Sequence, residues 1–142
     1  MKINSRKALL LVGLTASIFF SSLSSPAKAG YADTDSVYRG GICTEDLFRN
    51  GSGVTIDAKG NMTGVSVNVA PGQTAEVATG NLRNKKVGVS TVSAIKKAGG
   101  TIVASPTTNN SYHALLSGIT PATAESLFKP SVIPNPSQQC SK

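Results

Sequence analysis

The alternation of apolar and polar residues along the chain predicts short strands separated by turns. The clearest segment is 62–69, M-T-G-V-S-V-N-V, in which Val65, Val67 and Val69 fall on one face of a strand while Ser66 and Asn68 fall on the other. We therefore expect the three valines to be buried and the two polar residues to line a cleft that they share with Arg39. Shorter runs of β-branched and apolar residues predict further strands at 37–39, 54–56, 86–90, 101–104 and 112–116.

Capping residues predict short helices between these strands. Thr44 can cap a helix at 45–50, with Leu47 and Phe48 facing the core, and Thr120-Pro121 begins a helix that runs to Phe128. Ser90 or Thr91 caps another that runs to Lys97, the segment 71–80 is a loop or a weak helix, and the proline-rich end from Pro130 is extended. This order predicts an α+β fold: a single small domain with a curved, mostly antiparallel sheet and short flanking helices.

The first 29 residues have the pattern of a signal peptide. Lys2, Arg6 and Lys7 precede a mostly apolar run at 8–23, and Ala27-Lys28-Ala29 is the small-x-small pattern that a signal peptidase recognises. We expect cleavage between Ala29 and Gly30, which leaves residues 30–142 as one secreted or periplasmic domain.

Removal of this leader changes the charge and sets the context of the cysteines. The chain has 14 basic and 7 acidic residues, and losing Lys2, Arg6, Lys7 and Lys28 leaves 10 against 7, a net charge of +3. A charge this small does not by itself indicate a nucleic-acid-binding protein. Cys43 and Cys140 are the only cysteines, and in an exported chain such a pair predicts a disulfide. With one histidine they do not form a convincing zinc site, so no metal is expected.

Two positions have side chains suited to chemistry. Arg39 ends a predicted strand next to Gly40-Gly41, where its planar fork of donors suits a phosphate; the ordinary interpretation is an exposed arginine before a turn. His113 is the only histidine, and histidine is the usual side chain for moving protons near neutral pH; the ordinary interpretation is a structural or exposed residue. The sequence contains no G-x-S-x-G, H-E-x-x-H, Walker or G-x-G-x-x-G motif.

Several short motifs together resemble a known group of toxins. They are V-Y-R-G-G at 37–41, G-V-S-V-N at 64–68, V-G-V-S-T-V at 87–92, and H-A-L-L-S-G-I-T-P at 113–121 with the later L-F-K-P and N-P. The pattern is similar to that of TreTu-like toxin domains, found at the C-termini of bacterial polymorphic toxins and related to ADP-ribosyltransferases that modify a translation factor. This resemblance implies that Arg39, with Gly40, holds the phosphates of NAD and that Ser66 braces its nicotinamide half. It also implies a target protein in the translation machinery and a cognate immunity protein.

One element of the transferase pattern is missing. Such enzymes carry a glutamate late in the sheet, whereas the last strands here hold His113, Ala114 and Leu115. A site with histidine and arginine but no acid also suits RNA cleavage, with His113 as the base and Arg39 steadying the pentavalent phosphate. The sequence therefore leaves three alternatives: an NAD-dependent transferase with His113 and Ser66 at its catalytic site, a secreted ribonuclease toxin that uses His113, and a non-enzymatic, disulfide-closed binding domain.

Overall fold

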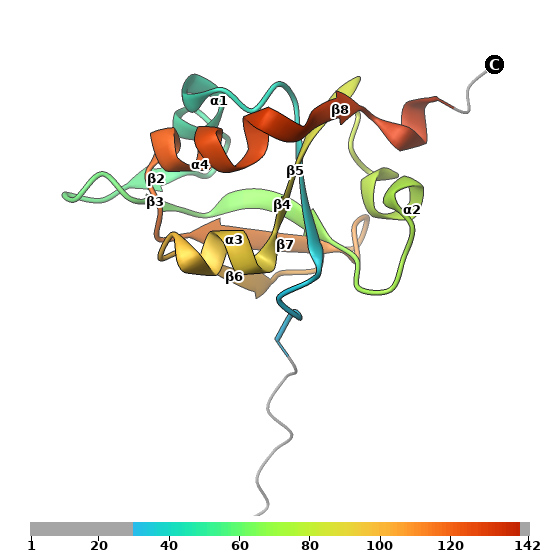
Figure 1. Ribbon diagram of the computed structural model, residues 1–142, viewed down its shortest axis with the longest axis horizontal. Coiled ribbons are helices and arrows are strands. Elements are labelled where there is room, and N and C mark those ends of the chain that lie inside the picture. The colour runs from blue at the N-terminus through green and yellow to red at the C-terminus, as the bar shows by residue number, and fades with distance from the viewer. Residues whose placement is uncertain (1–29, 140–142) are drawn as a thin grey trace, which may run out of the picture.

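The computed structural model describes residues 30–139, which form one six-stranded antiparallel sheet with helices on both faces (Figure 1). The expected signal peptide and Cys140 lie outside the described residues. The strand order is β6-β7-β4-β1-β5-β8, so the first strand lies inside the sheet. Its strands are β1 (Ser36–Gly40), β4 (Val65–Val69), β5 (Lys86–Thr91), β6 (Thr101–Ala104), β7 (His113–Ser117) and β8 (Val132–Pro134). The predicted α+β class and mostly antiparallel sheet are confirmed.

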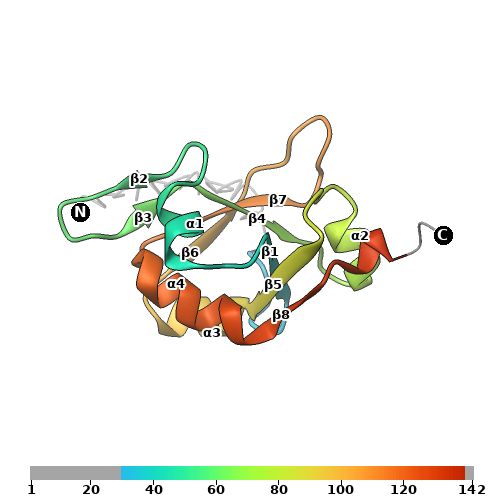
Figure 2. The same cartoon turned by 90° about the horizontal axis from the view of Figure 1, so that it is seen from above.

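The remaining elements are short. β2 (Thr55–Ile56) and β3 (Met62–Thr63) form a separate hairpin, which projects at the end of the molecule opposite α2 (Figure 2). The helices are α1 (Glu45–Arg49), α2 (Ala75–Thr79), α3 (Val92–Lys97), α4 (Pro121–Phe128) and the 3₁₀ turns η1 (Lys129–Ser131) and η2 (Pro136–Gln138). No helix within residues 30–139 has the length and apolar character needed to cross a membrane.

Threonine caps explain where the α-helices begin. Each α-helix in the described residues follows a threonine whose hydroxyl accepts a hydrogen bond from the main-chain N–H three residues later. The predicted caps at Thr44, Thr91 and Thr120 are confirmed, and Pro121 occupies the first turn of α4, where no N–H is needed. The segment 71–80, predicted as a loop or a weak helix, contains α2 behind the cap Thr74.

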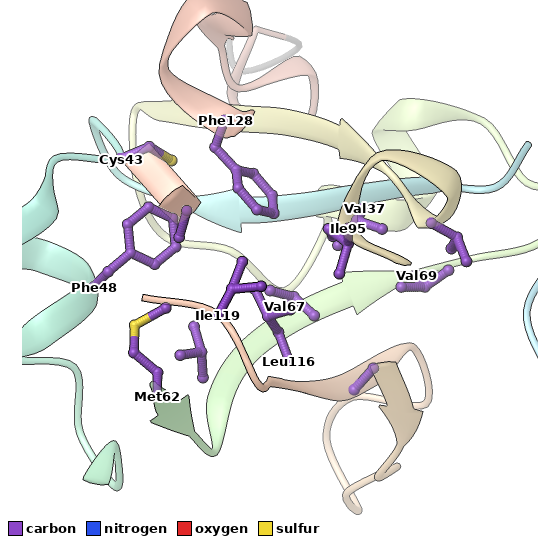
Figure 3. Packing of buried hydrophobic residues seen from close by; sticks show 14 residues of the cluster. Val37, Cys43, Phe48, Met62, Val67, Val69, Ile95, Leu116, Ile119 and Phe128 are labelled. Carbon is purple, nitrogen blue, oxygen red and sulfur yellow. The ribbon is translucent and has the colours of Figure 1, made fainter. Parts of the chain in front are cut away.

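One face of the sheet carries the main core beneath α1, α3 and α4. Val65, Val67 and Val69 are fully buried there, as their alternation predicts. Phe48 from α1 and Phe128 from α4 point toward each other across it, with ring centroids 5.5 Å apart (Figure 3). Such an aromatic pair supplies much of the buried apolar area in a core that is otherwise aliphatic.

Three local predictions need correction. The sequence predicts Leu47 in the core with Phe48, but Leu47 is 43% exposed, because a helix as short as α1 buries only one side. The segment 62–69 is interrupted at Gly64, which has φ +84° and lies so close to the Gly53 carbonyl that a Cβ would be 3.0 Å from it. In the tail, residues 132–134 are extended as predicted and pair with β5 as the edge strand β8, with Lys86 opposite Pro134, whereas 129–131 and 136–138 form 3₁₀ turns.

The other face is only partly covered. Tyr38, Ala70 and Ala78 form a small buried cluster where α2 packs on the sheet. Farther along this face, on β4, β7 and β6, Ser66, His113 and Leu115 are half-buried and Val103 is 62% exposed. We call this partly covered side the outer face.

Candidate functional site

Ser66 and His113 meet on the outer face because β4 and β7 are neighbours. The register sets Ser66 opposite Leu115 and Asn68 opposite His113, so the two side chains are diagonal neighbours on the same face. His113 Nε2 lies 3.0 Å from Ser66 Oγ, and His113 Nδ1 lies 2.7 Å from the Ser105 carbonyl oxygen. The imidazole is thus held at both nitrogens.

The Ser105 carbonyl fixes the tautomer of His113. A carbonyl oxygen can only accept a hydrogen bond, so Nδ1 carries the proton and donates it to Ser105. In the neutral ring, Nε2 then has a free lone pair and accepts from the Ser66 hydroxyl. This arrangement aligns a hydroxyl, a base and a group that orients the base, in the geometry used to activate nucleophiles.

A chain of amides holds the loop that supplies this carbonyl. Asn68 Nδ2 donates to the Ala78 carbonyl at 2.8 Å, and Asn68 Oδ1 accepts from Asn110 Nδ2 at 2.8 Å. Asn110 Oδ1 in turn accepts from the Tyr112 N–H. The expectation that Asn68 lines a cleft is wrong: its side chain is buried and tethers the 105–112 loop to β4 and α2.

Arg39 lies on the core face, at the point where β1 and β4 separate. The pairing of these strands ends at Tyr38 and Asn68, and two further residues of the same register would set Gly40 opposite Ser66. Instead Arg39 Nη1 donates to the Ser66 carbonyl at 2.9 Å, and the guanidinium carbon lies 5.9 Å from the centroid of the Phe48 ring. Ser66 is therefore contacted from both sides: by Arg39 through its main chain and by His113 through its side chain.

Burial shifts the pKa values of Arg39 and Cys43, which lie close to the point where β1 and β4 separate. Partial burial lowers the pKa of the Arg39 guanidinium, with the nearby Cys43 acting in the opposite direction. Burial raises the pKa of the Cys43 thiol, against the smaller effects of a hydrogen bond with Gly88 and of the Arg39 charge. The structure therefore favours a neutral thiol at Cys43, which packs as a small apolar group.

The two glycines after Arg39 serve the protein's own packing. The space beside Gly40 is filled by the Asn84 side chain, whose Oδ1 would be 2.1 Å from a Cβ at this position. Gly41 has φ +104°, which only glycine adopts without strain, and it turns the chain toward α1. The predicted contact between Gly40 and NAD phosphates thus requires Asn84 to move aside.

The predicted disulfide remains a prediction because Cys140 lies outside the described residues. Cys43, the only cysteine within residues 30–139, is buried in the main core and faces Gly88. The last described residues pack elsewhere: Ser137 in η2 donates to the Thr79 carbonyl at the end of α2. Two titratable thiols in the denatured protein, purified under oxidising conditions, would contradict the pairing.

A surface pocket of about 500 Å³ lies away from these residues. It is lined by Glu45, Ala122, Glu125, Ser126, Lys129 and Pro130, between α1 and α4. The Glu125 carboxylate already has two hydrogen-bond partners in this pocket: it accepts from the Glu45 N–H at 2.5 Å and from Lys129 Nζ at 2.9 Å. In the part of the chain that the structure describes, no three His, Cys, Asp or Glu residues cluster as a metal site would require.

The contribution of Ser105 could not be found in the sequence. It acts through a main-chain carbonyl, so its residue type carries no signal. The contact between Ser66 and His113, which are 47 residues apart, depends on the register of β4 and β7, so the sequence indicates each residue but not their contact.

No protein-family model, curated protein or solved structure matches the chain. The function is therefore inferred from the contacts of Arg39, Ser66 and His113.

Proposed function

We propose that this chain is an exported toxin-like domain that binds NAD and transfers ADP-ribose to a protein. The observation that carries the proposal is that Arg39 and His113, on the strands β1 and β7 that flank β4, contact Ser66 from opposite faces of the sheet, Arg39 through the Ser66 carbonyl and His113 through its hydroxyl. The transferase pattern has a first-strand arginine, a serine on a following strand and a glutamate late in the sheet, and Arg39 and Ser66 match the first two. The glutamate has no counterpart here, and the polar group beside Ser66 on β7 is His113.

Arg39 is the phosphate-binding group in this proposal. Within residues 30–139, Nη1 is the only nitrogen of its guanidinium that donates a hydrogen bond, which leaves the rest of the fork for the pyrophosphate oxygens. The bond to Ser66 and the Phe48 ring hold the guanidinium in place, so that little side-chain freedom is lost when NAD binds.

His113 performs proton transfer where a glutamate would also supply charge. The bond between nicotinamide and ribose breaks, nicotinamide leaves as a neutral ring, and the target side chain attaches to the ribose carbon. His113 Nε2 accepts the proton that the target side chain loses. A neutral imidazole gives no negative charge to an oxocarbenium-like transition state, so turnover should be slower than with a carboxylate.

The proposed partners are those that the resemblance to TreTu-like toxin domains implies. The target is a protein of the translation machinery, a cognate immunity protein protects the producing cell, and the mature domain is secreted or periplasmic.

Isothermal titration of NAD into the purified protein tests this proposal. Arg39→Lys keeps the charge but lacks the flat fork, and should weaken NAD binding roughly ten- to a hundredfold. Arg83→Ala, a change at an exposed arginine, is the matched control and should leave the affinity unchanged. NAD binding that survives Arg39→Lys at the parent affinity would reject Arg39 as the phosphate site.

RNA cleavage is the second candidate, and the lone pair at His113 Nε2 favours it. That nitrogen is oriented to take a proton from a hydroxyl, and a ribose 2′-hydroxyl could occupy the place of the Ser66 hydroxyl. Under this alternative His113→Gln abolishes cleavage of an RNA substrate and NAD has no effect. If the protein neither binds NAD nor cleaves RNA, the remaining alternative is the non-enzymatic, disulfide-closed binding domain.

A further inference from the structure

We propose that Ser66 is an activated nucleophile that forms an acyl-serine with carboxylic esters, with His113 as its general base. This inference does not rest on NAD binding. It comes from the arrangement of three groups: Ser66 Oγ, His113 Nε2 at 3.0 Å, and the Ser105 carbonyl at 2.7 Å from His113 Nδ1.

Each of these groups has the orientation that the chemistry requires. A serine hydroxyl is a weak nucleophile until an adjacent base takes its proton, and the base must present a lone pair to it. The Ser105 carbonyl keeps the proton of the imidazole on Nδ1, which is the role that a carboxylate has in a catalytic triad. Here a main-chain oxygen orients the ring, and the backbone bond from the Ser105 N–H to the His113 carbonyl at 2.9 Å fixes that oxygen.

An apolar row beside Ser66 supplies a place for an acyl chain. Leu115 is opposite Ser66 on β7, and Val103 is opposite Leu115 on the edge strand β6. Residues directly opposite in antiparallel strands point to the same face, so the row runs from the hydroxyl across the outer face. Val103 is 62% exposed at its end, which leaves apolar surface open to a short acyl group.

A main-chain donor lies next to the nucleophile. The N–H and carbonyl of one strand residue point to the same side, and the Ser66 carbonyl faces the split between β1 and β4. The register of these two strands stops at Tyr38 and Asn68, so the Ser66 N–H is not used in pairing with β1. The nucleophile's own N–H is a common donor to the oxyanion of an acyl-transfer intermediate.

The proposed reaction has two balanced steps. Ser66 Oγ attacks the ester carbonyl carbon while its proton moves to His113 Nε2, and the proton then leaves with the alcohol as the ester bond breaks. Water next attacks the acyl-serine, gives one proton to Nε2 and releases the carboxylic acid, and Ser66 Oγ regains its proton from Nε2. Only an ester and water are consumed.

An alkyl fluorophosphonate, which modifies activated serines with loss of fluoride, is the direct probe of this nucleophile. We expect one label on the purified protein, located at Ser66 by peptide mass mapping, and slow release of nitrophenolate from 4-nitrophenyl acetate. Ser66→Ala should abolish the label. His113→Gln should slow labelling by roughly 10² to 10⁴, the usual contribution of a general base. Ser126→Ala is the control, because Ser126 is exposed and its hydroxyl donates to the Thr123 carbonyl instead of to a base.

The outcomes separate the nucleophile from its alternatives. A label at Ser66 that slows in a folded His113→Gln protein supports the proposal, and mapping of the parent protein keeps the test valid if that variant does not fold. No label, a label on another residue, or equal rates in the parent and a folded His113→Gln protein would overturn it. Failure of NAD to bind changes none of these results.

Discussion

The two faces of the sheet differ in how they use the same strands. On the core face, β1 and β4 contribute the buried Val37 and Val67 and the half-buried Arg39, whose guanidinium lies over the Phe48 ring of α1. On the outer face, the alternate residues of β4 and β7 include Ser66 and His113, which hydrogen-bond to each other and remain half-buried. The core face stabilises the domain and also carries Arg39, the proposed phosphate-binding residue, whereas the outer face presents the hydroxyl and the imidazole.

Ser66 is the residue at which these two roles meet. Its carbonyl is held by Arg39 from the core side, while its hydroxyl is aligned with His113 on the outer side. A change to Arg39 should therefore act on folding and on the position of β4 as well as on NAD binding, whereas a change to His113 should act mainly on reactivity. The predictions below test this division.

The largest difference between the two faces is expected in the free energy of unfolding, when the Phe48–Phe128 pair of the core face is disrupted. Phe128→Ala removes a fully buried ring from the core face and should lower the free energy of unfolding by about 3–5 kcal/mol. Val103→Ala, an exposed position at the outer edge, should change it by less than about 0.5 kcal/mol. Chemical denaturation measures both, and equal effects would contradict the assignment of the core to one face.

Arg39→Lys should have the next largest effect on stability. Lysine cannot keep both the bond to the Ser66 carbonyl and the flat contact with Phe48, and a lost hydrogen bond to a charged donor costs about 1.5–3 kcal/mol. Arg49→Lys is the matched control, since its ion pair with Glu45 is exposed. Equal denaturation midpoints for the two variants would show that Arg39 does not hold β4.

Gly88→Ala should destabilise the protein by about 1–3 kcal/mol through overpacking. A Cβ at Gly88 would lie 2.3 Å from Cys43 Sγ, inside the main core. Cys43→Ala removes the sulfur, so the double variant should recover part of the loss in thermal unfolding. Strictly additive effects would contradict the contact.

The smallest expected effect is on the stability of the fold at acidic pH. The hydrogen bond from Lys129, followed by that from the Glu45 N–H, lowers the pKa of the Glu125 carboxyl. A lowered pKa in the folded state gives stability that is present above the ordinary glutamate pKa and is lost as the pH falls through the lowered value. The difference in unfolding free energy between the parent and Glu125→Gln should therefore shrink as the solution is acidified. A difference that is constant with pH would contradict the role of this carboxylate.

The sequence predicted the fold better than it predicted the site. The alternation of Val65, Val67 and Val69 and the threonine caps are local signals, and they gave the buried face and the helix starts correctly. The glycine at position 64 itself indicates a close approach to the backbone, which is confirmed, but the approaching Gly53 carbonyl belongs to a separate segment and cannot be identified from the alternation. The strand β8 depends on pairing with β5, and no local signal in the proline-rich tail indicates it.

The candidate site was also predicted only in part, because its contacts join separate elements. Arg39, Ser66 and His113 stood out by residue type and by the toxin-like motifs. The sequence does not show which face of the sheet each side chain occupies. Arg39 faces the core while Ser66 and His113 face outward, because of the strand register and the separation of β1 from β4. Asn68 looked like a cleft residue because it is polar, whereas the buried amide chain that it forms requires Asn110 from a distant loop.

The tautomer of His113 tests the central claim most directly, namely that the outer face holds a serine aligned with an oriented base. The chain has one histidine, so two-bond ¹H–¹⁵N correlation spectra of untagged, ¹⁵N-labelled protein contain one imidazole to assign. At a pH where the ring is neutral, we predict the proton on Nδ1 and a lone pair on Nε2, in the parent and in Ser66→Ala alike, because the Ser105 carbonyl holds that proton. A ring protonated on Nε2, or one that averages between both tautomers, would contradict the account.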